Sequence, residues 1–564
     1  MSITQQEKIN KTTEINGIIY LINKEDQTAS VVSCNTSNNE ISIPRSISIK
    51  TKEYIITKIS NLRFAKIKSV KFSVFSEIQK IDDRAFFGSE IESFQITDHL
   101  TYIGKSAFRD CGKLQKVEIS DFSELQTIEQ EAFYNTQIES FTIPPHLTFI
   151  GESAFNNCNK LREIKIPENS DLKTIGKCAF ANTKIEYFTI PPHLTCIGES
   201  AFENCIQLCR IEIPENSELK IIEKEAFSNT SIESFTIPPH LTKIGDYSFK
   251  DCKKLRTFII PNNSELQTIG SSAFNNSLIE SLTLPATLVD VKEGWCSLMP
   301  NLMKIAVSPD NPRFSMHGDK MIIEKSTESE NFDALFFCWR DIQKVTIPSF
   351  IKIIRSCAFA YCDQLHQFEI PSNCEIQSIE CYAFSKSSIE YFTIPPTVTK
   401  ISKGSFLQCK KLRRVEFQKD SKIEKIECWA FSGSKIESFT IPPHLTEIED
   451  YAFHKCSKLR RVEFLDNSQL EIIGDCAFNM SAIECFTIHP SVTKIGIQAF
   501  DFCKNLQIIE IDENSVIEPF HIINQFTSHN EQLLVMIPVN KRDEVICNDN
   551  SNDLFNSDDY ADFL

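Results

Sequence analysis

The ten residues Ile138-Glu-Ser-Phe-Thr-Ile-Pro-Pro-His-Leu147 return almost letter for letter at 185–194, 232–241 and 436–445. The first two returns follow at steps of 47 residues. Self-similarity at a fixed period of this size is typical of a solenoid, in which each repeat packs mainly against its neighbours. The sequence therefore predicts a repeat array, whose long surface favours binding over catalysis in an enclosed chamber.

Each 47-residue period contains two turns, and phenylalanines mark them at alternating steps of 22 and 25 residues. The first block of marks is Phe86, Phe108, Phe133, Phe155, Phe180, Phe202, Phe227, Phe249 and Phe274. The second block is Phe359, Phe384, Phe406, Phe431, Phe453, Phe478 and Phe500. Turns of this length suit a leucine-rich-repeat arrangement with one strand per turn.

The strand of each turn can be placed from its alternation of apolar and polar residues. Phe141-Thr-Ile143 and Val415-Glu-Phe417 show this period of two, which indicates a half-buried strand. Pro144 and Pro145 end the first of them, because proline cannot donate to a strand ladder. We expect the strands of successive turns to pair in parallel. The segment 150–155 is expected to form a short helical or 3₁₀ turn on the returning leg.

The pattern Ile-Pro-x-x-Leu-Thr-x-Ile-Gly-x-x-Ala-Phe-x-x-Cys-x-x-Leu resembles the BspA-like (treponemal-type) leucine-rich repeat, over residues 60–515. The opening segment 18–32 also looks like the leader that precedes such repeats. The resemblance implies an α/β repeat solenoid, a right-handed superhelix with a parallel β-sheet on one face and one strand per 22–25-residue turn. It also implies a surface antigen or adhesion-type protein that binds host or matrix proteins without enzymatic activity.

Departures from the repeat predict the division of the chain. Trp295 stands where a phenylalanine belongs, and the next clear match is Phe359. The last segment is rich in Asp and Asn and has no periodicity, which is typical of disorder. The predicted parts are an N-terminal β cap (1–58), a first repeat block (59–307), a β-hairpin insertion (308–341), a second block (342–515), a C-terminal cap (516–547) and a disordered acidic tail (548–564).

The bulk composition excludes some classes of partner. The 564 residues carry a formal net charge of −17, which argues against nucleic acid, because proteins that bind it usually present a basic stripe. The first ten residues are polar, and no run approaches the ~18 apolar residues of a membrane helix. We expect no transmembrane segment, no cofactor and a monomer. Localisation stays open, since the missing signal peptide favours the cytoplasm and the resemblance favours the cell surface.

Stacked turns should place small polar residues in one column. In the longer turns this residue is Cys111, Cys158, Cys205, Cys252, Cys362, Cys409, Cys456 or Cys503, and in the shorter turns it is Thr or Ser. The expected role is to satisfy buried backbone groups at the bend. A disulfide framework or metal site is the alternative, but cysteines two turns apart exceed the ~7 Å limit between bridged Cα atoms. A second column holds His99, His146, His193, His240 and His444, expected to be exposed loop residues that could also titrate together.

Outward-facing strand positions predict where a partner binds. Lys410-Lys-Leu-Arg-Arg414 and, 47 residues later, Ser457-Lys-Leu-Arg-Arg461 form the densest positive feature. Arginine and tyrosine are frequent anchors of interfaces. The candidate protein-binding residues are Tyr187, Arg210, Tyr391, Arg413, Arg414, Arg460 and Arg461. The alternative interpretation is a solvated charge ladder, in which glutamates such as Glu390 and Glu437 neutralise these arginines.

We find no catalytic motif, metal site or cofactor site in the sequence, and therefore expect no enzyme. A catalytic site needs a constellation that occurs once, and only residues 308–342 offer one, with Asp310, His317, Asp319 and Trp339. A hairpin that widens the binding surface is the favoured interpretation of that region. Two hypotheses remain for the array: a surface protein that binds host or matrix proteins, or an intracellular scaffold for an endogenous partner.

Overall fold

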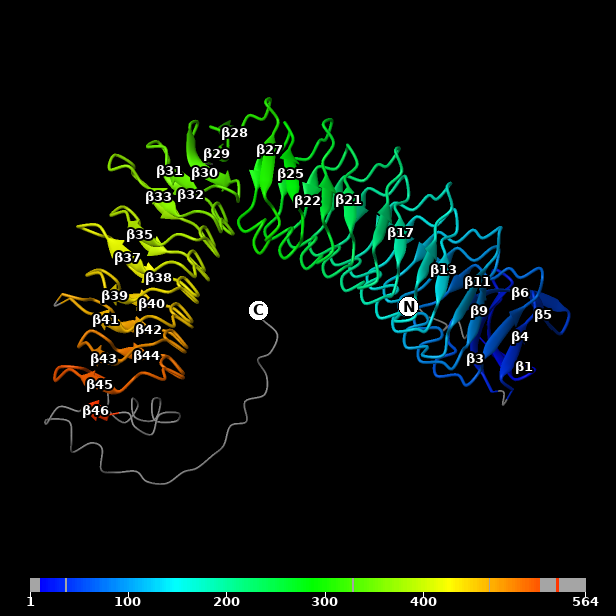
Figure 1. The fold of residues 1–564 in the computed structure, drawn as a ribbon. Coiled ribbons are helices and arrows are strands. Elements are labelled where there is room, and N and C mark those ends of the chain that lie inside the picture. Colours follow the sequence, from blue (N-terminus) through cyan, green and yellow to red (C-terminus); the bar gives the residue numbers. More distant parts are fainter. Residues whose placement is uncertain (1–10, 36–37, 327–328, 466, 518–533, 537–564) are drawn as a thin grey trace, which may run out of the picture. The chain divides into compact units, whose positions relative to one another are not determined.

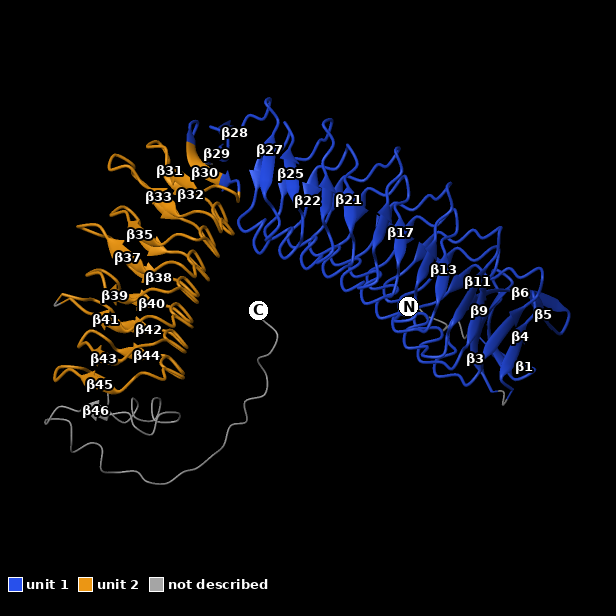
Figure 2. Ribbon diagram, viewed as in Figure 1, with its two compact units in different colours: residues 1–332, 337–339 blue, residues 333–336, 340–564 orange. Residues whose placement is uncertain are grey.

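The computed structural model describes residues 11–35, 38–326, 329–465, 467–517 and 534–536. It contains two compact units, unit 1 with Met1–Phe332 and Phe337–Trp339, and unit 2 with Asp333–Phe336 and Arg340–Leu564 (Figure 2). Each unit is a stack of turns, and the described residues contain no helix (Figure 1). The predicted tail (548–564) and most of the predicted C-terminal cap (516–547) lie outside the described residues. The five predicted boundaries between the six parts stay predictions.

Unit 1 begins with six strands that precede the repeats. They are β1 (Thr12–Ile15), β2 (Ile18–Asn23), β3 (Thr28–Cys34), β4 (Glu40–Ile43), β5 (Ser46–Ile49) and β6 (Lys52–Ile59). β1, β2 and β3 form an antiparallel meander, and β5 pairs antiparallel with β6. β3 and β6 pair in parallel, and β6 then pairs with the first short repeat strand. The cap therefore offers an edge on which the parallel stack continues.

Longer strands line one side of unit 1, at the places that the alternation predicts. They are β7 (Ser69–Phe72), β9 (Ser93–Ile96), β11 (Lys116–Ile119), β13 (Ser140–Thr142), β15 (Glu163–Lys165), β17 (Tyr187–Thr189), β19 (Arg210–Glu212), β21 (Ser234–Thr236), β23 (Thr257–Ile259), β25 (Ser281–Leu284) and β27 (Lys304–Val307). From β13 on they pair in parallel as doublets, β13 with β15, β17 with β19, and so on. The predicted parallel pairing is thus present. The first sheet on this side has four strands, β4, β7, β9 and β11, and each later one in unit 1 closes after two.

A second, unbroken ladder of two-residue strands runs along another side of the turns. Its members are β8 (Lys80–Ile81), β10 (Tyr102–Ile103), β12 (Thr127–Ile128), β14 (Phe149–Ile150), β16 (Thr174–Ile175), β18 (Cys196–Ile197), β20 (Ile221–Ile222), β22 (Lys243–Ile244), β24 (Thr268–Ile269) and β26 (Asp290–Val291). Each pairs in parallel with the next. The sequence did not predict this ladder, which continues from one doublet to the next. Single backbone bonds such as that from the Phe155 N–H to the Ala179 carbonyl also link neighbouring doublets.

Unit 2 repeats the same design. Its longer strands are β31 (Lys344–Thr346), β33 (Gln367–Glu369), β35 (Tyr391–Ile394), β37 (Arg414–Phe417), β39 (Ser438–Thr440), β41 (Arg461–Glu463), β43 (Cys485–Ile488), β45 (Ile508–Ile511) and β46 (Leu534–Met536). Its short strands are β32 (Ile353–Ile354), β34 (Ser378–Ile379), β36 (Lys400–Ile401), β38 (Lys425–Ile426), β40 (Glu447–Ile448), β42 (Ile472–Ile473) and β44 (Lys494–Ile495). Doublets again form on the long-strand side, as between β35 and β37.

The predicted helical turn on the returning leg is absent, and the backbone bonding gives the reason. The N–H groups of Ser153, Phe155 and Asn157 donate to carbonyls of the following turn, at 2.7 to 3.0 Å. Ser153 and Asn157 also have φ of 54° and 61°, in the left-handed region that a right-handed helix cannot contain. Every second backbone N–H of this segment therefore donates to the following turn of the stack, and the segment forms a series of tight turns. The predicted α/β class is therefore wrong in its helical part. The chain is a parallel-strand solenoid similar to leucine-rich repeats.

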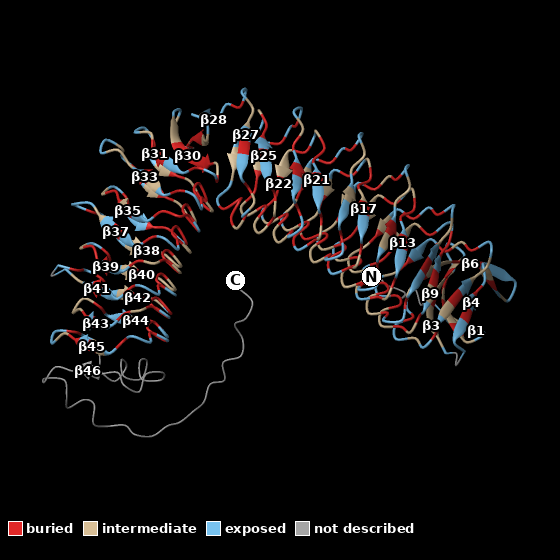
Figure 3. Ribbon diagram, in the orientation of Figure 1, coloured by how far each residue is buried: buried red, intermediate tan, exposed pale blue. Residues whose placement is uncertain are grey.

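Phenylalanine rings form the core of each unit, as the spacing predicts. Buried residues recur in every turn of the stack (Figure 3). Phe155 is fully buried, and its ring stacks between Phe133 at 5.2 Å and Phe180 at 5.4 Å. Phe141 of β13 packs edge-on against Phe155 at 4.9 Å between centroids. Aromatic pairs of both geometries add about 0.5–1.5 kcal/mol each to the gain from burial.

Buried cysteines close each doublet, which agrees with the role expected for their column. Cys158 Sγ donates to the carbonyl of Phe133 at 3.1 Å and lies 3.2 Å from the Thr136 hydroxyl. Cys205 makes the same contacts to Phe180 and Thr183. The cysteines that the structure describes are free thiols, so no disulfide framework joins them.

Residues of the predicted insertion occur in both units. In unit 1, β28 (Phe314–His317) and β29 (Met321–Lys325) form an antiparallel hairpin, and Arg313 pairs with the buried Glu324 at 2.6 Å. β30 (Phe332–Cys338) contains the unit boundary, and its unit 2 part pairs in parallel with β32.

Arg340 opens the repeats of unit 2 with a buried side chain. Its Nη1 donates to the Ala358 carbonyl at 2.8 Å, and its Nη2 donates to the Cys357 carbonyl at 3.0 Å. Inside unit 1 the equivalent carbonyl, Ala179, accepts instead from the backbone N–H of Phe155 in the preceding turn. At the first turn of the block the arginine side chain thus donates the hydrogen bond that a backbone N–H of the preceding turn donates elsewhere.

Replacing Arg340 with methionine is expected to cost unit 2 about 2–3 kcal/mol, because two buried carbonyls lose charged donors. Hydrogen exchange should quicken in residues 355–362 and remain unchanged at the far turns. Arg413→Met, a change at an exposed arginine, should stay within about 0.5 kcal/mol of the parent. Unchanged exchange at 355–362 would show that the arginine does not stabilise this turn.

Candidate functional site

The outward positions of the longer strands lie on the exposed side of the stack. Alternate strand residues point to the core, so Phe188 of β17 is buried while Tyr187 is 41% exposed. The candidate binding residues all take outward positions: Tyr187 and Arg210 on β17 and β19 in unit 1, and the other five on or just before β35, β37 and β41 in unit 2. Each unit therefore has its own candidate surface.

A tyrosine and an arginine are direct partners in both units. In unit 1 Tyr187 pairs with Arg210 in the β17–β19 register. The Tyr187 hydroxyl donates to Glu163 at 2.9 Å, and this bond raises the pKa of the phenol. Arg210 pairs with Glu212 of its own strand at 2.7 Å. In unit 1 these polar groups are satisfied within the protein.

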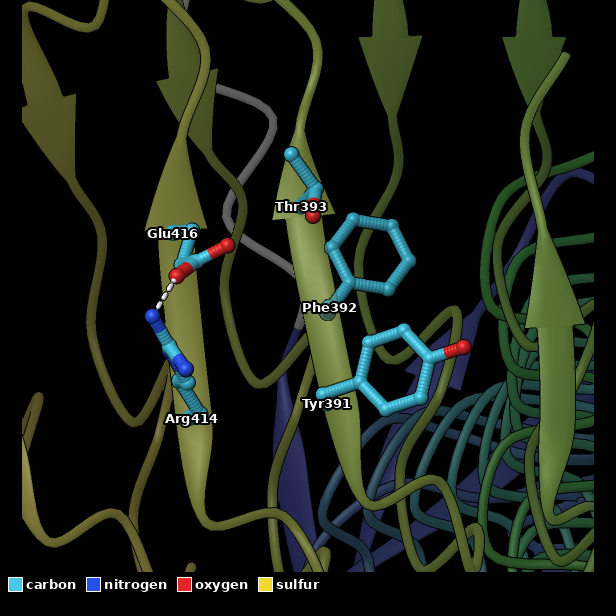
Figure 4. A pocket seen from close by; sticks show the side chains of 5 residues that line it. All are labelled: Tyr391, Phe392, Thr393, Arg414 and Glu416. Atoms are coloured by element: carbon cyan, nitrogen blue, oxygen red, sulfur yellow. Dashed lines mark ion pairs between the residues drawn. The ribbon is translucent and has the colours of Figure 1, made fainter.

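The equivalent pair in unit 2, Tyr391 and Arg414, lines a shallow pocket of ≈ 250 Å³ (Figure 4). Phe392, Thr393 and Glu416 complete the lining, and Arg414 forms an ion pair with Glu416. Tyr391 is 53% exposed, more than Tyr187. The place of Glu163 is taken here by a glutamine, Gln367, whose amide donates to Glu369 at 2.6 Å. Within the described residues the Tyr391 hydroxyl has no hydrogen-bond partner, so it is available to a ligand.

The remaining arginines divide into paired and unpaired groups. Arg460 lies 3.6 Å from Glu484 of the next turn, as Arg162 does from Glu186. The charge ladder is therefore present in part, because within the described residues Glu390 and Glu437 form no ion pair with the candidate arginines. The pairs that do form lie between neighbouring doublets, where the backbone N–H of Glu186 also donates to the Arg162 carbonyl at 3.2 Å. Among the residues that the structure describes, Arg413 and Arg461 have no ion pair, and both are exposed.

Sequence reasoning missed several members of the site. It did not include the lining residues Phe392, Thr393 and Glu416, because these occupy ordinary repeat positions that look alike in every turn. A signal was present in Gln367, since the exchange of a carboxylate for an amide beside the tyrosine distinguishes β35 from β17. Only alignment of the two turns residue by residue would have revealed it.

Other candidates from the sequence are placed in structural roles. His146, His193 and His240 are exposed, and the Nδ1 of each lies 3.1 to 3.2 Å from a carboxylate of the following turn. Trp339 donates its indole N–H to the Ile305 carbonyl at 3.3 Å. In the described part of the chain no cluster of three metal-ligating side chains occurs. Nor does that part contain a helix that could cross a membrane.

Comparison with known proteins places the repeats in a family. The model of the BspA type leucine rich repeat region matches residues 57–173, 173–301, 330–460 and 424–525. No curated protein matches the chain. A leucine rich cell surface protein from Faecalibacterium prausnitzii is 21% identical, with 89% of this chain and 95% of that chain covered and a TM-score of 0.38. A leucine-rich repeat protein from Bacteroides ovatus is 19% identical, with coverage of 93% and 98% and a TM-score of 0.39.

Proposed function

The chain belongs to the BspA-type leucine-rich repeat family, and on that premise we propose that it is a non-enzymatic protein-binding solenoid of the surface-antigen or adhesion type. A protein ligand docks on the outward faces of the longer strands. The right-handed sense of the coil is part of this proposal, as is a monomeric state. The proposed contact residues are Tyr187, Arg210, Tyr391, Arg413, Arg414, Arg460 and Arg461.

The pocket between Tyr391 and Arg414 carries the proposal. A half-exposed tyrosine with an available hydroxyl beside an arginine has the composition that interface anchors favour. Two exposed arginines without ion pairs, Arg413 and Arg461, flank it on the same side of unit 2. A ligand can bind these arginines at little cost in free energy, because no ion pair within the protein has to break first.

Binding is tested by capture on the immobilised full chain, first from a panel of matrix proteins and host-cell extracts and then from extracts of the cells that make the protein. The paired change Tyr391→Ala and Arg461→Ala should weaken capture of the bound protein at least about tenfold, as loss of an interface anchor does. Thr399→Ala, an exposed residue just before the short strand β36, serves as the control and should leave capture unchanged. Equal capture by all three chains would remove this surface as the binding site.

An intracellular scaffold is the second candidate, and the many buried thiols favour it. Free thiols in such number suit a reducing compartment. Labelling of intact cells with a membrane-impermeant reagent decides between the two candidates. Labelled protein places the solenoid at the surface, and labelling only after permeabilisation assigns it to the interior.

A further inference from the structure

One column of the turns has different chemistry in the two units. It is the residue two positions after each core phenylalanine, and it lies in the left-handed backbone region throughout, with φ of 55° to 71° in unit 2. In unit 1, from the turn of Phe108 onward, it is always Asp or Asn: Asp110, Asn135, Asn157, Asn182, Asn204, Asn229, Asp251 and Asn276. In unit 2 it never is: Tyr361, Lys386, Gln408, Gly433, Lys455, Met480 and Phe502.

The unit 1 column is the structurally favoured one. Asp and Asn tolerate positive φ better than other residues with a side chain, because their short polar groups can bond locally. They also bond along the stack: Asn204 donates to Asn182 at 3.2 Å, and Asn229 donates to Asn204 at 2.8 Å. Lysine at the same φ lacks the short polar group that can bond its own backbone, although Lys386 does contact the column residue of the preceding turn, Tyr361. Backbone strain that persists where a better residue is available points to a use for the side chain.

The substituted column in unit 2 forms part of a positive edge. Lys386 and Lys455 are in the column, and Lys410, Lys411, Lys435 and Lys458 follow it by two to three residues in successive turns. No carboxylate occurs in the intervening segments 385–389, 407–412, 432–436 and 454–459. Within the described residues none of these six lysines forms an ion pair. Unit 1 also has lysines two or three residues after its column, at Lys113, Lys160, Lys184, Lys253 and Lys254. What distinguishes unit 2 is the additional pair of column lysines, Lys386 and Lys455.

Lys386 contacts the column residue of the preceding turn. The Lys386 ammonium lies 5.0 Å from the centre of the Tyr361 ring and 3.3 Å from its hydroxyl, in the neighbouring turn. Lys410, one turn further on, adds to burial in lowering the pKa of Lys386. Lysines on successive turns repel each other, and a bound anion relieves that repulsion.

The edge adjoins the pocket described above. Lys410 and Lys411 stand three to four residues before Arg414, and Lys386 stands five residues before Tyr391. At the strand starts Glu390 and Glu437 separate the arginines. These two carboxylates disfavour a uniformly charged polymer such as a nucleic acid or a sulfated glycan. A polypeptide can place a neutral residue opposite them and an aromatic side chain in the pocket.

We propose that the lysine edge of unit 2, comprising Lys386, Lys410, Lys411, Lys435, Lys455 and Lys458, binds an acidic polypeptide segment whose apolar side chain enters the Tyr391 pocket. The inference rests on the proposed protein-binding function and specifies the chemistry of the partner. Its carboxylates lie along the lysines of successive turns. Unit 1, with Asp and Asn in the same column, lacks the equivalents of Lys386 and Lys455.

The test titrates fluorescein-labelled (Glu-Glu-Phe)₄ into the full chain and follows anisotropy at two salt concentrations. The variant Lys386→Asn with Lys455→Asn restores the unit 1 residue and should bind about tenfold more weakly, with a smaller loss on adding salt. Lys253→Asn with Lys254→Asn, the same change of charge in unit 1, is the matched control and should bind like the parent. Thermal unfolding of the first variant should be unchanged or slightly higher, because asparagine suits the left-handed backbone.

Three results would overturn the proposal: no binding of the peptide, equal binding by the parent and both variants, or binding of a sulfated oligosaccharide in place of the peptide. Binding of a (Lys-Lys-Phe)₄ peptide as tight as that of (Glu-Glu-Phe)₄ would also overturn the proposal. These failures are distinct from failure of the proposed function. If the Tyr391→Ala and Arg461→Ala variant lost its protein ligand while Lys386→Asn and Lys455→Asn had no effect on the peptide, the strand face would stand and the lysine edge would not.

Discussion

Replacing Phe155 with alanine is expected to lower the stability of unit 1 by about 3–5 kcal/mol, the usual cost of removing a fully buried phenylalanine. The ring touches aromatic neighbours on three sides, Phe133, Phe141 and Phe180, so the cavity has walls from three turns. These walls belong to a continuous backbone ladder and cannot close in easily. We therefore expect the upper half of that range.

Urea unfolding with hydrogen exchange at peptide resolution measures the effect and its extent. Because each turn contacts mainly its neighbours, faster exchange should be confined to the turns on either side of residue 155. Phe122→Ala is the control, since Phe122 is 79% exposed and its loss should change stability by less than about 0.5 kcal/mol. Similar losses for the two variants would contradict the stacked core.

Raising the pH above 9 is expected to destabilise the protein steeply, because burial raises the pKa of the column thiols. The pKa of Cys158, Cys205 and Cys252 rises from 9.0 to about 11. Below pH 9 these thiols are protonated in both states, so their contribution is fully present. Between pH 9 and about 11 the unfolded chain releases protons that the folded chain keeps, and the contribution is lost. Each thiol accounts for about 1.4 kcal/mol per pH unit, and the three together for about 4 kcal/mol per pH unit.

The measurement is the urea midpoint at pH 8, 9 and 10 under reducing conditions, for the parent and for the triple change of Cys158, Cys205 and Cys252 to serine. Serine occupies the same column in other turns, such as Ser434 and Ser481, so it fits the site. It does not titrate in this range, and the triple variant should lose stability more slowly above pH 9. Parallel curves for the two proteins would show that other groups, such as tyrosines, govern the alkaline loss.

Much of this architecture could be predicted from the sequence because the repeat copies its signal many times. The long-strand positions, the phenylalanine core and the bonding role of the cysteine column all follow from spacing and alternation. The two-residue strands could not be predicted, because two residues such as Thr127-Ile128 are too few to show an alternation of period two. These strands form because their backbones pair with the neighbouring turn, and a local sequence pattern contains no information about that pairing.

The helical turn was wrongly predicted for a similar reason. The segment 150–155 contains residues that are compatible with a helix, and only the bonds from Ser153 and Phe155 to the next turn exclude it. The candidate site was predicted in part. Tyr391 and Arg414 emerged from residue type and position, whereas the availability of the Tyr391 hydroxyl depends on what stands opposite it, Gln367 in place of a glutamate. Specificity in a repeat protein lies in such differences between equivalent turns.

The pairing of strands into doublets also affects which duplications and deletions of repeats in the gene leave the fold intact. A thiol of one turn bonds to the carbonyl and hydroxyl of the turn before it, as Cys158 does to Phe133 and Thr136. Unequal crossing-over that adds or deletes a whole doublet leaves every such partnership intact. An event that adds a single turn sets cysteine beside cysteine, or threonine beside threonine, and interrupts the alternation. The heritable module of this protein is therefore the pair of turns, which accounts for near-identity at 47 residues and not at 22 or 25.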